Sequence, residues 1–138
     1  MPPSPEFRLR TAVREHLDQV GLEFLAEFLS RAVQKQPENM DALTELGRVL
    51  TELGRFDEGL AVDMSLAQLA PQNPIVHYNL GCSLALLGRR EEALASLRRA
   101  IELGYDDPDF LRSDDDLSSL REDPEFLALL RILEQPGN

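Results

Sequence analysis

Cysteine, histidine and tryptophan are scarce in this sequence: there is one cysteine, Cys82, there are two histidines, and tryptophan is absent. One cysteine forms no internal disulfide and supplies no cysteine-based zinc cluster. His77 lies five positions before Cys82, on a different side of a helix, and His16 is remote in sequence. We therefore expect no metal site and no cofactor. A free cysteine on a helix is usually a small buried apolar residue, and we favour that interpretation over a redox or acylation role.

Long hydrophobic runs are also missing. No stretch approaches the ~18 to 20 uncharged apolar residues that a membrane span needs. The first eight residues contain neither the basic nor the apolar segment of a secretory signal. These absences predict a cytoplasmic protein without a membrane partner.

Basic residues are outnumbered, with 14 Lys and Arg against 25 Asp and Glu and a formal net charge of −11. Nucleic acid is a poor partner for such a chain, because its affinity rests on Lys and Arg that neutralise phosphates. Electrostatic steering favours basic partners instead. Much of the excess lies in residues 106–138, which hold ten acids against three arginines.

Catalytic motifs are absent too. The sequence has no Gly-x-Ser-x-Gly elbow, no phosphate-binding loop and no nucleophile beside a histidine. The run from Asp114 to Asp116 lacks the Asp-x-Asp-x-Asp-Gly order of a calcium loop, so helix capping and solubility explain it better. We predict that the protein is not an enzyme.

What the sequence does contain is a repeat of 34 residues. Leu46-Gly47 recurs as Leu80-Gly81, and this interval is the period of a helix–turn–helix repeat. Further matching pairs are Pro37 with Pro71, Leu50 with Leu84, Leu53 with Leu87, Gly54 with Gly88, and Leu60 with Leu94.

Apolar periodicity, glycine turns and proline stops divide the chain into helices. Ser4 is a candidate N-cap for the first helix, and Gly21 is expected to end it. Strand-like alternation of useful length is missing. The expected helices are Pro5–Val20, Leu22–Gln36, Met40–Leu53, Phe56–Ala70, Pro74–Leu87 and Arg90–Leu103.

These features resemble the tetratricopeptide repeat family. The signature positions are occupied by Leu43, Leu46, Gly47, Leu50, Gly59 and Pro71, and then by His77, Leu80, Gly81, Leu84, Ala93, Leu97 and Ala100. The resemblance implies an all-α fold, a right-handed superhelical stack of about three antiparallel helix pairs with C-terminal capping helices. It implies one domain, divided into a degenerate unit (6–39), two clear repeats (40–73 and 74–107) and acidic capping helices (108–138).

The tail is similar to the end-of-group form of this repeat in bacterial proteins, which predicts a bacterial protein. Asp107-Pro108 and Asp123-Pro124 should each start a short helix. The side chains expected to cover the apolar end of the last repeat are Phe110, Leu111, Leu117, Leu120, Phe126, Leu129 and Leu130.

The family's inward positions imply a peptide-binding groove. Its candidate residues are Arg10, Arg14, Asp41, Thr44, Arg48, Tyr78, Asn79 and Cys82. The arginines could grip a carboxylate, although a solvated or locally paired side chain is the favoured interpretation of each. Thr44 stands where the clamp for chaperone C-termini would have a lysine, so that clamp is not expected.

The resemblance therefore implies a non-enzymatic scaffold for protein–protein interaction, binding a peptide or partner protein in the groove. The alternative is a structural protein that assembles as a homo-oligomer through an exposed repeat end. In that case Val13, Leu17 and Val20 of the first helix are the expected interface.

Overall fold

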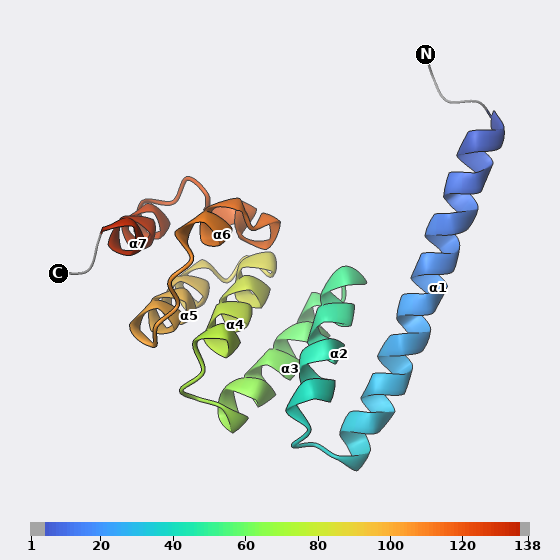
Figure 1. Cartoon of the computed structure of the whole chain (residues 1–138), viewed down its shortest axis with the longest axis horizontal. Coiled ribbons are helices and arrows are strands. Elements are labelled where there is room, and N and C mark those ends of the chain that lie inside the picture. The colour runs from blue at the N-terminus through green and yellow to red at the C-terminus, as the bar shows by residue number, and fades with distance from the viewer. Residues whose placement is uncertain (1–4, 136–138) are drawn as a thin grey trace.

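Helices make up the whole regular structure of residues 5–135, the part of the chain that the computed structural model describes (Figure 1). These residues contain seven α-helices and one 3-10 helix and no strand. The expectation of an all-α stack of helices is confirmed. Ser4, the candidate N-cap, lies outside the described residues.

The first helix, α1 (Pro5–Lys35), is continuous over 31 residues. The expected break at Gly21 was wrong: α1 runs straight through it, and its N-terminal half extends beyond the other helices (Figure 1). A glycine inside a helix costs only about 1 kcal/mol relative to alanine, and no proline nearby blocks the helix. The unit expected over 6–39 therefore lacks the turn of a helix pair.

Two helical hairpins follow α1. The first joins α2 (Met40–Glu52) to α3 (Phe56–Leu69), and the second joins α4 (Pro74–Leu86) to α5 (Arg90–Glu102). Gly54 and Gly88 have φ angles of 76° and 74°, in the left-handed region that glycine adopts without strain. The residue after each glycine donates its N–H to a carbonyl in the last helical turn, at 2.9 Å in both hairpins. This Schellman motif ends the helix and starts the return.

The close contact within the second hairpin depends on Gly81. A Cβ at this position would lie 2.9 Å from both Cγ and Cδ2 of Leu97. Leu97 and Ala93 are buried and belong to the largest hydrophobic cluster, which joins α4 and α5 to the C-terminal segment. The glycine at this signature position therefore lets α4 and α5 approach each other closely.

Three short helices form the C-terminal cap: α6 (Pro108–Ser113), η1 (Asp115–Leu120) and α7 (Pro124–Glu134). Asp107, Asp114 and Asp123 accept hydrogen bonds from backbone N–H groups at their starts. The two helix starts expected at Pro108 and Pro124 are confirmed. The cap buries Leu111, Leu117, Leu120, Phe126, Leu129 and Leu130 as expected, whereas Phe110 is 52% exposed, contrary to expectation.

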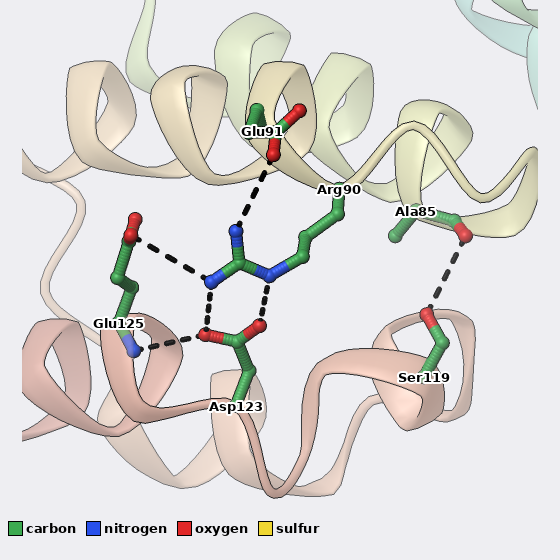
Figure 2. Close-up of polar contacts among 6 residues, drawn as sticks. All are labelled: Ala85, Arg90, Glu91, Ser119, Asp123 and Glu125. Atoms are coloured by element: carbon green, nitrogen blue, oxygen red, sulfur yellow. Dashed lines mark hydrogen bonds and ion pairs between the residues drawn. The ribbon is translucent and has the colours of Figure 1, made fainter.

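The cap is fastened to the second hairpin by polar contacts as well. The guanidinium of Arg90 forms a bidentate ion pair with the carboxylate of Asp123, in which Nη2 lies 3.0 Å from Oδ1 (Figure 2). Ser119 donates its hydroxyl to the carbonyl of Ala85 at 3.5 Å. The cap therefore has a defined position over α4 and α5.

Candidate peptide-binding pocket

A pocket of about 530 Å³ lies where α2, α4 and the cap meet. Its walls come from one face of α2 and one face of α4, since side chains three or four positions apart share a face of a helix. The cap forms one side of the pocket. The lining residues include Thr44, Arg48, Thr51 and Glu52 of α2, Asp63 of α3, Tyr78, Asn79, Cys82 and Ser83 of α4, and Phe110, Asp114 and Asp116 of the cap.

Five of the eight candidate groove residues line this pocket: Thr44, Arg48, Tyr78, Asn79 and Cys82. The other three do not. Arg10 and Arg14 line a separate shallow depression on α1, because α1 continues past Gly21 instead of folding back. Asp41 is exposed near the start of α2, outside the pocket lining. The structure thus corrects the expectation of one groove that contains all eight.

The guanidinium of Arg48 is already paired on its own helix. It forms ion pairs with Glu45 and Glu52, one turn before and one turn after it. The hydrogen bond that it donates to Glu45 is the main cause that raises the pKa of Arg48. The local-pairing interpretation of this arginine is confirmed, and few of its donors remain for a ligand carboxylate.

Tyr78 connects the second hairpin to the cap. Its hydroxyl donates to Oδ2 of Asp114 at 2.5 Å, and the Cys82 thiol donates to the same oxygen at 3.7 Å. The Tyr78 ring stacks on Tyr105 with centroids 4.6 Å apart, and Phe110 approaches it at 5.8 Å. Tyr78 and Cys82 are therefore fixed in place on the pocket wall.

The Cys82 thiol is poorly suited to react as a nucleophile. Burial raises its pKa, and the negative charges of Asp114 and Asp116 raise it further. A thiol in such surroundings stays protonated, whereas reactive cysteines sit in electropositive surroundings that lower their pKa. The buried position agrees with the apolar interpretation.

Acidic groups gather at the cap side of the pocket. The Cys82 sulfur and one carboxylate oxygen each of Asp114 and Asp116 lie within 4.8 Å of one another. Burial raises the pKa of Asp116, and the charges of Asp114 and Asp115 add to this effect. Among the side chains that the structure describes, no basic group pairs with the carboxylate of Asp114 or Asp116; Arg121 contacts Asp115 and the backbone oxygen of Asp114 instead. These three groups could ligate a metal ion, but the ion would have to displace the thiol proton.

Asp63 was not anticipated as a pocket residue. It is only 7% exposed, and its carboxylate accepts a hydrogen bond from Ser83. Burial raises its pKa to about 6, against an ordinary value of 3.8, while the Ser83 hydrogen bond lowers it. The sequence did contain a signal for this residue. Asp63 is equivalent in the 34-residue repeat to Leu97, a core residue of the second hairpin, so an acidic residue stands at a position expected to be buried.

No helix within residues 5–135 has both the length and the apolar character that crossing a lipid bilayer requires.

Comparison with protein families gives two matches. The tetratricopeptide repeat model matches residues 25–74. The model described as the A/B hydrolase-like, N-terminal domain matches residues 67–136.

Curated relatives are longer than this chain. A chloroplastic protein of Arabidopsis thaliana is 28% identical over 80% of this chain and 33% of its own length. The "Peroxisomal targeting signal receptor" of Komagataella phaffii is 34% identical over 66% of this chain and 15% of its own length. The chain thus spans about a third of the first relative and less than a sixth of the second.

Solved structures confirm the fold. A crystal structure of MamA has a TM-score of 0.68 and is 15% identical, covering 97% of this chain and 77% of its own. The repeat signature, the two hairpins and the family matches agree, so the chain belongs to the tetratricopeptide repeat family, and its residues 67–136 belong to the family described as the A/B hydrolase-like N-terminal domain.

Proposed function

We propose that this chain is a non-enzymatic scaffold that binds a peptide or a partner protein in the pocket, and that the ligand inserts a basic side chain there. One observation carries the proposal: the carboxylates of Asp114 and Asp116 lie together without a basic partner among the described residues. The aromatic rings of Tyr78 and Phe110 stand beside them.

Charge and aromatic surface together favour a cation in this pocket. Two neighbouring carboxylates repel each other, and the raised pKa of Asp116 reflects part of that repulsion. A Lys or Arg side chain would relieve the repulsion while its charge lies over the half-exposed ring of Phe110. An anionic ligand is disfavoured, because Arg48 is already neutralised by Glu45 and Glu52. The net charge of −11 steers a basic partner towards the chain.

Family membership supports the peptide class of ligand. One relative is named as the receptor of a targeting signal. Because this chain spans 15% of that relative's length, the likeness supports a binding role and leaves the ligand to be identified by the chemistry of the pocket.

The match to a hydrolase-like N-terminal domain raises the question of catalysis. We infer a non-catalytic role for this chain, because Cys82 is hydrogen-bonded to a carboxylate that favours the thiol over the thiolate. Neither histidine is close to Cys82 in a way that would let it act as a base: His77 faces the carbonyl of Pro71, and His16 is exposed on α1.

A peptide selection tests the proposal. Random peptides displayed on phage are selected on the purified chain, and we expect them to share one Arg or Lys. Asp116→Asn and Phe110→Ala should each weaken binding of a selected peptide by about tenfold, the equivalent of ~1.4 kcal/mol. Fluorescence anisotropy measures the affinity.

The matched control is Asp106→Asn, which removes the same charge from an exposed site outside the pocket. It should leave the affinity nearly unchanged. Selected peptides without a shared basic residue, or equal affinities for Asp116→Asn and Asp106→Asn, would contradict the proposal.

Self-assembly is the second candidate function. The observation that favours it is the exposure of apolar side chains on α1, including Val13, Leu17 and Val20, which are 50%, 63% and 47% exposed.

A further inference from the structure

Helix α1 has two apolar faces, and only one of them packs against other residues that the structure describes. The inner face contacts α2 through Ala26 and Leu29, which are buried, and through Leu22, Leu25 and Val33. The second face consists of Val13, Leu17, Val20, Phe24 and Phe28, which are 47% to 72% exposed. We call these five residues the outer stripe.

The outer stripe lies on the far side of α1 from α2. At about 100° per residue, its centre is roughly 150° around the helix from the inner face. Single exposed apolar residues are ordinary, but five at spacings of three and four form a continuous surface of the kind that binds another protein. In Figure 1 the rest of the molecule lies to one side of α1, so a partner has free access from the other.

We infer that the outer stripe is the contact between two copies of this chain, whose α1 helices pack antiparallel across it. This inference deepens the self-assembly candidate by naming its partner and geometry. It does not depend on peptide binding, because the outer stripe and the pocket share no residue.

The sequence of the stripe indicates a second copy of the same chain. The stripe is nearly symmetric about residues 20 and 21: Leu17 and Phe24 are equally far from that point, and so are Val13 and Phe28. A two-fold axis at that point would place each phenylalanine opposite a smaller side chain of the other copy. The two helices could then keep the same separation along the whole contact. Such a self-complementary patch is what a two-fold dimer requires, and an unrelated partner imposes no such symmetry.

The centre of the stripe also permits close approach. Gly21 lies halfway along the stripe and at its edge, about 60° around the helix from its centre line, and a Cβ at that position would meet no other atom within 4 Å. Two helices can pack closely where one of them lacks a side chain. The area of the contact is just large enough for a specific dimer. The five side chains expose roughly 500 Å² per copy. Pairing two copies therefore buries on the order of 1,000 Å² in total, near the lower limit for a specific interface. The dimer should therefore dissociate on dilution.

Sedimentation equilibrium over a range of concentrations tests the dimer. The wild-type chain should shift from monomer to dimer as concentration rises, and Leu17→Glu combined with Phe24→Glu should remain monomeric. Both residues are exposed, so far-UV circular dichroism should show an unchanged fold. Ile132→Glu, at a residue 57% exposed on α7, is the control and should still dimerise. A wild-type monomer at every concentration, or a double variant that still dimerises, overturns the inference.

Cysteine cross-linking tests the orientation. Under mild oxidation Val20→Cys should link to its own copy. Val13→Cys should not link to itself but should link to Phe28→Cys when the two variants are mixed. The wild-type chain, whose only thiol is the buried Cys82, is the control and should stay unlinked. Efficient self-linking of Val13→Cys would indicate parallel helices and overturn the antiparallel geometry. Peptide binding by the monomeric double variant, measured separately, reports on the pocket alone.

Discussion

Among the Asp, Glu, Lys and Arg side chains that the structure describes, Asp63 is the most buried, at 7% exposed. Its pKa of about 6 exceeds the ordinary 3.8, so the folded chain binds this proton more tightly than the unfolded chain. Protonation of Asp63 therefore stabilises the fold fully below the unfolded pKa, and this stabilisation is lost as the pH rises through about 6. At neutral pH the carboxylate is ionised and its burial is a net cost.

The raised pKa of Asp63 gives a prediction for Asp63→Asn, in which the side chain keeps its shape but no longer titrates. From about pH 7 to about pH 5, the free energy of unfolding of the wild type should rise by about 1 kcal/mol relative to the variant. Urea unfolding at each pH measures it, with the exposed Asp106→Asn as the control. Equal pH slopes for the wild type and Asp63→Asn would show that Asp63 titrates normally.

Single residues could be assigned to the pocket from the sequence where the 34-residue repeat fixes their position on a helix. Thr44, Arg48 and Tyr78 could be assigned to the pocket because their positions on α2 and α4 follow from the 34-residue period. Phe110 and Asp116 could not, because the cap falls outside that period and its docking depends on three-dimensional packing. Whether the assigned residues bind a peptide stays a prediction.

Individual helices were predictable where their ends are encoded locally. Asx–Pro pairs mark the starts of α4, α6 and α7, and Gly54 and Gly88 mark the turns. Gly21 offered a similar signal and was misread, because glycine permits a turn without requiring one. The Schellman bonds at Gly54 and Gly88 form where the flanking helices turn back and pack against each other, whereas α1 continues through Gly21 as one helix.

The junction of α5 and α7 yields a prediction at the element scale. Asp123 both caps α7, through the N–H of Glu125 at 2.9 Å, and pairs with Arg90. Asp123→Ala removes both interactions and should lower the melting temperature by a few degrees, more than Arg90→Ala does. Thermal unfolding followed by circular dichroism measures both.

Asp107→Ala serves as the reference for capping alone, since Asp107 caps α6 through the N–H of Phe110 at 3.0 Å. If Asp123→Ala and Asp107→Ala lower the melting temperature equally, the pair with Arg90 contributes nothing measurable.

At the scale of the whole molecule, packing is uneven along the chain. The largest hydrophobic cluster joins α4 and α5 to the cap, while a smaller one joins α1 to α2. Residues 12–20 of α1 are all exposed. Repeat proteins gain stability from contacts between neighbouring units, so we expect local stability to increase from the N-terminus towards α4 and α5.

Hydrogen exchange followed by mass spectrometry tests this gradient. In the monomeric Leu17→Glu, Phe24→Glu variant, amides of residues 12–20 should exchange orders of magnitude faster than those of α4 and α5. The monomeric variant is needed because pairing of α1 would protect the same amides in the wild type. Uniform protection along the chain would contradict a gradient.

The hydrogen bond between Tyr78 and Asp114 joins residues 36 positions apart, one in the second hairpin and one in the cap. The pocket is therefore a composite site that exists only while the cap is docked. Ligand binding in this pocket and docking of the cap are linked equilibria. A ligand would therefore stabilise the docked cap by the same free energy by which the docked cap strengthens binding of the ligand. If the pocket binds a ligand as we propose, exchange of the cap for one with a different segment at 110–116 should alter ligand choice without changing either hairpin, and specificity would then depend on the cap as much as on the repeats.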